Sequence, residues 1–205
     1  MDHFILDTNL FFNMEAGISL GGTTKEVMQK VIDFAVRSKA DNSAVLYMPP
    51  RIVDEISGFF DNPQEDILKE LLSVVIIKAP DASQVQFPAP VFYRLIEDVR
   101  NRSYRGLQIA EEEVEKTATE MMGKEVLPKV PFQKAIGAII KTLRMRYRNA
   151  TRTGFLDSVA DLDLIMLAKE VNGCVVTTDE GVTIWARHFG VKEMPATAFG
   201  KRLSA

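Results

Sequence analysis

Short apolar runs alternate with helical segments at both ends of this 205-residue chain, and this alternation constrains the fold more than any other feature. Prolines end the second and third runs, as expected for strands that stop sharply. Strands that alternate with helices are typical of an α/β fold built on a parallel sheet. The strands are expected at residues 4–7, 44–48, 74–77 and 174–179, with an edge strand at 191–195.

The middle of the chain, from about residue 81 to 130, offers helical segments and no strand candidate. Two helices are expected, "VFYRLIEDVRNRSY" and "GLQIAEEEVEKTATEMMGK", with a break at Gly106. We therefore expect a helical hairpin at residues 85–128, inserted between two parts of one α/β domain at 1–84 and 129–205. A third helix, "FQKAIGAIIKTLRMRYRNA", is expected to lead back into the second part.

Composition places the chain among ordinary globular proteins, with 46% apolar and 26% charged residues. No apolar run approaches the roughly 20 residues that span a bilayer, and the start "MDHFILD" has no basic leader region. The single cysteine, Cys174, cannot form an intramolecular disulfide. A reducing cytoplasm is therefore the expected compartment, with no membrane association.

Carboxylates follow two of the apolar runs and gather on one predicted helix. Asp7 and Asp179 come at strand ends, where parallel sheets collect ligands. Asp157 and Asp161 are four apart and share a helix face, whereas Asp163 lies roughly 240° around from Asp157 and is expected to cap or to face elsewhere. Close acids repel one another unless a cation lies among them. The pattern therefore predicts a site for a hard divalent ion, Mg²⁺ or Mn²⁺.

Each carboxylate also has an ordinary structural interpretation. Asp7 can bond the backbone of a turn, and Asp179 or Asp157 can cap a helix. Asp161 is the hardest to explain in this way, because aspartate is a poor helix former. Glu55 is a further candidate ligand or a solvated helix residue. Their joint placement favours the metal site.

Other common chemistries lack their residues. A phosphatase of the haloacid dehalogenase type needs an aspartate where this chain has Asn9, and there is no phosphate-binding P-loop. His3 and His188 have no partners at zinc spacing, so structural roles are expected for both.

A cationic stripe precedes the carboxylate helix. Along a helix, side chains four apart drift only about 40° per step, so most of these cations share one face. The run has no acid at i±4 to pair with, and although charge runs are usually solvated faces, arginine suits phosphate. The candidate RNA-binding residues are Lys141, Arg144, Arg146, Arg148 and Arg152.

"FILDTN", the "D-x-x-x-D-x-D-L-I-x-L-A" helix and "VVTTDEG" resemble the acidic signature of PIN-domain metal-dependent ribonucleases, which have a Rossmann-like parallel sheet. With the helical insertion and "LRMRYRNATRTGF", the whole chain is similar to the HARP family of minimal protein-only ribonuclease P, also called RNA ligase partner proteins.

The resemblance implies that the catalytic carboxylates are Asp7, Asp157, Asp161 and Asp179, with Asp163 as a secondary member. Of these, Asp7, Asp161 and Asp179 would hold one or two Mg²⁺ ions, with Mn²⁺ as a possible substitute. In the wider PIN pattern a glutamate often joins the site; Glu55 lies at about that place, but we do not assign it a role.

The resemblance also implies an activity: hydrolysis of precursor tRNA to remove its 5′ leader, leaving a 5′-phosphate, with Arg144 and Arg148 contacting the RNA. The hairpin would assemble the chain into a large homo-oligomer, commonly a dodecamer. Two alternatives stay open. One is a toxin-like PIN endoribonuclease, which the long insertion disfavours; the other is a non-catalytic RNA-binding partner or scaffold, which would not need the aspartates.

Overall fold

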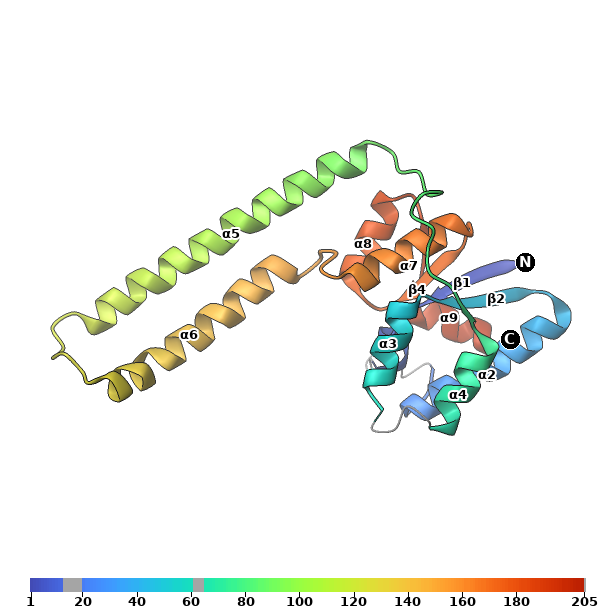
Figure 1. The fold of residues 1–205 in the computed structure, drawn as a ribbon, viewed down its shortest axis with the longest axis horizontal. Helices are drawn as coiled ribbons and strands as arrows, with labels where there is room; N and C mark the ends of the chain where they lie inside the picture. The colour runs from blue at the N-terminus through green and yellow to red at the C-terminus, as the bar shows by residue number, and fades with distance from the viewer. Residues whose placement is uncertain (13–19, 61–64, 205) are drawn as a thin grey trace. The chain divides into compact units, whose positions relative to one another are not determined.

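A parallel sheet forms the centre of the first compact unit, Met1–Pro88 and Leu156–Ala205. In the computed structural model, which describes residues 1–12, 20–60 and 65–204, this sheet has five strands in the order β3-β2-β1-β4-β5, all parallel. Figure 1 labels the three inner strands β1, β2 and β4. β1 lies at the centre, with Ile5 opposite Tyr47 of β2 and Leu6 opposite Val176 of β4. The strands are β1 Asp2–Leu6, β2 Ala44–Met48, β3 Ile76–Ile77, β4 Cys174–Thr177 and β5 Lys192–Pro195.

Helices cover both faces of this sheet, as right-handed crossovers between parallel strands require. The helices α1, α4 and α9 contact α2, whereas α3 and α8 contact α7, which places them in two layers (Figure 1). Their bounds are α1 Asn9–Phe12, α2 Thr24–Asp41, α3 Pro50–Gly58, α4 Asp66–Val74, α7 Val159–Glu170, α8 Glu180–His188 and α9 Ala196–Leu203. The predicted α/β fold is confirmed.

The core explains why β1 and β4 read as continuous apolar runs. Both faces of a central parallel strand are covered, so neither face needs polar residues. Phe4, Ile5 and Leu6 are at most 2% exposed, and α7, which contacts β1 and β4, has five consecutive buried residues, 164–168. The polar side chains at the carboxyl ends of β1 and β4, Asp7 and Thr177, are therefore attached to well-buried strands.

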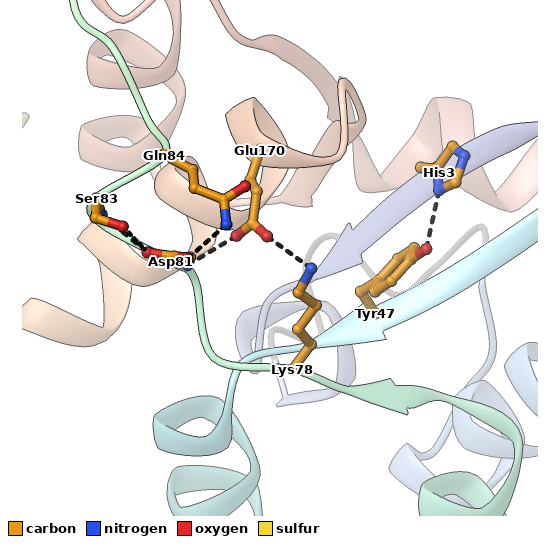
Figure 2. A network of polar contacts seen from close by, with 7 residues as sticks. All are labelled: His3, Tyr47, Lys78, Asp81, Ser83, Gln84 and Glu170. Carbon is orange, nitrogen blue, oxygen red and sulfur yellow. Dashed lines mark hydrogen bonds and ion pairs between the residues drawn. The ribbon is translucent and has the colours of Figure 1, made fainter.

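A polar network ties the segment after β3 to the far end of α7 (Figure 2). Lys78 forms an ion pair with Glu170 at 2.6 Å, and the backbone N–H of Asp81 donates to the same carboxylate at 2.8 Å. The hydrogen bond from Lys78 lowers the pKa of Glu170. Asp81 in turn accepts hydrogen bonds from Ser83 and Gln84. The carboxyl end of α7 is thereby fixed, while its amino end carries the acidic residues described below.

The second compact unit, residues 89–155, is an antiparallel pair of helices, α5 Pro90–Met121 and α6 Lys129–Arg152 (Figure 1). The expected break at Gly106 is wrong, because α5 continues through it. A Cβ at Gly106 would lie 2.6 Å from Cε2 of Tyr147 on α6. The glycine therefore permits a close approach between the two helices and does not end a helix.

The second arm of this hairpin is the arginine-rich helix. The sequence placed the insertion at residues 85–128 and put the arginine-rich helix in the α/β domain, whereas the compact unit runs from Ala89 to Phe155. The chain near Phe155 contacts α5, since the Arg102 guanidinium lies 4.5 Å from the Phe155 ring and donates to the Thr151 and Thr153 carbonyls. No helix among the described residues is both long enough and apolar enough to cross a membrane.

Candidate active site

Asp7 is the buried centre of the acidic cluster. It follows β1 directly, is 2% exposed, and its backbone N–H donates to the Val176 carbonyl of β4. Its carboxylate accepts hydrogen bonds from the backbone and side-chain nitrogens of Asn9, as the turn interpretation expected. Burial raises the pKa of Asp7 to about 6, against the opposing effect of the hydrogen bond from Thr177. The buried charge is thus costly, and the turn contacts only partly offset that cost.

Thr177 joins Asp7 to Asp179. Its hydroxyl donates to Oδ2 of Asp7 at 2.5 Å and accepts from the backbone N–H of Asp179 at 2.9 Å. Asp179 is the N-cap of α8, where its Oδ1 accepts from the N–H of Val182 at 2.9 Å. Capping leaves the second carboxylate oxygen available for another contact. The cap and the site are therefore compatible roles for one side chain.

The charges of the neighbouring carboxylates act on Asp161. It lies in the first turn of α7, which Ser158 caps by accepting a hydrogen bond from the N–H of Asp161. Burial is the main cause that raises the pKa of Asp161 to about 6, and the charges of Asp7, Asp179 and Asp157 raise it further. Asp157 itself is exposed, one residue before the cap. Asp161 therefore lies close enough to Asp7, Asp179 and Asp157 for their charges to act on it.

Two further acids lie at the same edge but pair with other side chains. Asp163 accepts a hydrogen bond from Nη1 of Arg51, at the start of α3, at 2.7 Å. Glu55, one turn further along α3, accepts from the Thr8 hydroxyl at 3.0 Å. The expectation that Asp157 and Asp161 share a face of one helix is wrong, because α7 begins only at Val159 and Asp157 precedes its cap. Glu55 reaches the residue next to Asp7.

The donor chemistry of the cluster suits a hard divalent cation, because every candidate ligand is a carboxylate oxygen. Burial is the main cause of the raised Asp161 pKa, and the neighbouring carboxylate charges add to it; such a cation would relieve this added repulsion. Within the described part of the chain, no group of three or more His, Cys, Asp or Glu residues is arranged to hold a metal ion by itself. Mg²⁺ usually keeps several waters, so an incomplete set of protein ligands is compatible with it.

The raised pKa values predict a pH-dependent stability when divalent cations are removed. Asp7 and Asp161 have pKa values of about 6 in the folded chain against 3.8 normally, so the folded state binds more protons between these limits. The free energy of unfolding should therefore fall as pH rises from about 4 to about 6. In EDTA at pH 7.5, Asp7→Asn is expected to raise the melting temperature by roughly 5 °C.

The rise in melting temperature caused by Asp7→Asn should shrink toward zero at pH 4, where the Asp7 carboxyl of the wild-type protein is protonated. Asp33→Asn, at an exposed position of α2, is the matched control and should change the melting temperature little at either pH. A difference between Asp7→Asn and wild type that does not vary with pH would contradict the buried-charge explanation.

The predicted RNA-binding cations lie in the other compact unit, on α6. Lys141, Arg144 and Arg148 are exposed there. Arg146 differs, because its guanidinium pairs with Glu112 and with Glu113 of α5, the latter at 2.7 Å. The sequence shows that α6 has no acid at i±4 from these cations. It does not show that acids of the neighbouring helix α5 pair with Arg146.

The acidic cluster of Asp7, Asp157, Asp161 and Asp179 is called the carboxylate edge below. Sequence reasoning missed three polar residues beside it, Thr177, Asn9 and Arg51. Thr177 precedes Asp179 by two positions, a spacing at which a hydroxyl can bond the backbone, but nothing in the sequence links it to Asp7. Asn9 was expected to offer its backbone to Asp7, but the hydrogen bond from its side chain was not predicted. Arg51 follows the proline pair that ends β2, and only the packing of α3 against α7 identifies its partner.

Comparison with known proteins covers both compact units. The chain matches the PINc domain ribonuclease family over residues 3–205. It is 36% identical over 203 residues to the RNA-free ribonuclease P of Pyrococcus furiosus, a match that covers 99% of this chain and 93% of that protein. It is 34% identical to the protein of the same name from Pyrococcus horikoshii, covering 100% and 92% of the two chains. The corresponding protein of Methanothermobacter thermautotrophicus is 32% identical, covering 98% and 94%.

Proposed function

The chain belongs to the PINc domain ribonuclease family and is an endoribonuclease with protein-only ribonuclease P activity, and from this premise we propose that it hydrolyses precursor tRNA with Mg²⁺ at the carboxylate edge. The products would be a tRNA with a 5′-phosphate and a leader with a 3′-hydroxyl. The observation that carries this proposal is the junction of Asp7, Thr177 and Asp179 beside Asp161.

Each residue of the proposed site would have a separate role in the reaction. Asp7, Asp161 and Asp179 would hold Mg²⁺, or Mn²⁺ in its place, and Thr177 fixes Asp7 by its hydrogen bond. A bound divalent cation supplies Lewis-acid stabilisation of charge on the scissile phosphate. Asp157 is exposed, so it can orient the attacking water by accepting its hydrogen bond. In the hydrolysis, the attacking water gives up one proton as its oxygen bonds to phosphorus, the bond from phosphorus to the leader O3′ breaks, and O3′ takes up one proton.

RNA contact by α6 is the second part of the proposal. Lys141, Arg144, Arg148 and Arg152 would bind backbone phosphates, so the folded tRNA is recognised by its shape more than by its sequence. Arg146 is a weaker candidate than the sequence suggested, because Glu112 and Glu113 already neutralise it.

Self-association through the hairpin is the third part, in line with the large homo-oligomer, commonly a dodecamer, that the sequence resemblance implies. Leu107 and Val114 on α5 are 56% and 67% exposed, and Val126 in the turn is 99% exposed. Apolar surface of this kind favours association. We propose that the assembled enzyme works in the cytoplasm, since the one cysteine lacks an intramolecular partner.

The proposed reaction predicts one cut in one place. Purified protein incubated with 5′-labelled precursor tRNA and Mg²⁺ should release the intact leader, and neither EDTA-treated protein nor Asp7→Asn should do so. The cleavage site is read at nucleotide resolution on a sequencing gel. Cuts at other positions would support the toxin-like alternative, and tight tRNA binding without cleavage would support the scaffold.

A further inference from the structure

Arg51 places its own positive charge at the rim of the carboxylate edge. α3 begins two residues after β2 ends, which places Arg51 near the carboxyl end of a central strand. Its Nη1 donates to Oδ2 of Asp163 at 2.7 Å. The side chain of Arg51 is 59% exposed, whereas that of Asp163 is only 13% exposed. The carboxylate is therefore the covered partner, and the guanidinium is the partner that solvent or a ligand reaches.

A second residue of α3, Glu55, contacts the chain segment next to Asp7. Glu55 lies four residues after Arg51, so the two side chains share a helix face. Glu55 accepts a hydrogen bond from Thr8, which follows Asp7 in the chain. The face of α3 that carries Arg51 thus lies along the acidic cluster and not away from it.

Neither stability nor metal binding explains the Arg51–Asp163 pair well. An ion pair with one largely exposed partner contributes little to stability. Asp163 is turned toward Arg51, whereas the carboxylates that act on Asp161 are Asp7, Asp179 and Asp157.

An RNA backbone must approach this negatively charged edge, and a cation on its rim lowers the repulsion. Arginine fits this task because its planar guanidinium carries five N–H donors and can hold a carboxylate on one side while it binds phosphate with the others. A carboxylate partner also restricts the rotamers of the long side chain, which reduces the entropy lost when phosphate binds.

We propose that Arg51 binds an RNA backbone phosphate beside the scissile bond, and that Asp163 is a positioning residue that holds the Arg51 guanidinium and is not a metal ligand. The proposal rests on the proposed cleavage of RNA at this edge. It assigns the two residues to substrate binding and separates Asp163 from the other four aspartates.

The test is a double-mutant cycle with Arg51→Gln, Asp163→Asn and the double variant, all in the full-length chain. Binding of precursor tRNA in EDTA is measured at several salt concentrations, and kcat and KM for leader removal are measured in Mg²⁺. Arg51→Gln should weaken kcat/KM about 10-fold and reduce the salt dependence of binding by about one phosphate contact. Arg51→Lys, which keeps the charge, should restore the salt dependence.

Asp163→Asn should show a smaller loss of the same kind at an unchanged Mg²⁺ requirement, and the double variant should be no worse than Arg51→Gln. Lys30→Gln, which removes an exposed cation of α2, is the matched control and should leave both quantities unchanged. Melting temperatures verify that every variant is folded.

A wild-type salt dependence in Arg51→Gln would overturn the phosphate contact. A higher Mg²⁺ concentration for half-maximal activity in Asp163→Asn would overturn its separation from the metal. If the wild-type protein does not remove the leader, the proposed function fails, but binding in EDTA still decides whether Arg51 contacts phosphate.

Discussion

Replacing Asp161 with asparagine is expected to reduce leader removal by about 10³-fold, while the affinity for precursor tRNA changes little. The substitution keeps the shape of the side chain but removes the carboxylate on which the charges of Asp7, Asp157 and Asp179 all act. It leaves the Ser158 cap intact, because that bond uses the backbone N–H of Asp161. Single-turnover cleavage and tRNA binding, measured on the same preparation, provide the comparison.

Glu180→Gln is the matched control, since it removes an exposed acid in the first turn of α8, next to Asp179 in sequence. Its cleavage rate should stay within a few-fold of wild type. If Asp161→Asn still cleaves at a rate close to wild type, the central role assigned to Asp161 is wrong. If it loses tRNA binding together with cleavage, the acidic edge contributes to affinity in a way that this assignment does not include.

Arg146→Met is expected to lower the melting temperature by roughly 5 °C or more. Glu113 is 3% exposed and accepts from Arg146 at 2.7 Å, so removing the guanidinium leaves a buried carboxylate without this partner. Breaking such a pair from one side costs far more than replacing both partners with apolar groups. The double variant Arg146→Met/Glu113→Leu should therefore recover most of the lost stability.

Arg148→Met, two residues further along α6, separates this structural role from RNA binding. Arg148 is exposed, so its loss should leave the melting temperature unchanged and weaken tRNA binding. Thermal unfolding followed by circular dichroism, together with binding assays, distinguishes the two arginines. Equal melting temperatures for Arg146→Met and Arg148→Met would show that the pair with Glu113 does not hold the hairpin together.

The fold and the resemblance to ribonuclease P proteins could be predicted from sequence because their determinants are local. A buried parallel strand needs a continuous apolar run, and Phe4 to Leu6 or Val175 and Val176 provide one. The motifs around Asp7, Asp161 and Asp179 are likewise short, and the family match over residues 3–205 confirms the family they indicated.

Features that depend on a neighbouring element were not predictable in this way. Gly106 looks like a helix break, yet the ring of Tyr147, 41 positions later, explains it. Arg146 looks like part of a uniform cationic stripe, yet its partners lie on α5. The same holds for Arg51 and Asp163, which are 112 residues apart and meet only because α3 packs on α7.

The hydrogen bond between Thr177 and Asp7 spans 170 residues of sequence. β1 is synthesised before β4, yet its central position in the sheet is completed only when β4 is present, after the whole hairpin has been synthesised. Until then Asp7 has neither Thr177 nor Asp179 beside it. Any activity that needs Asp7, Thr177 and Asp179 side by side therefore has to wait until β4 has been synthesised and has paired with β1.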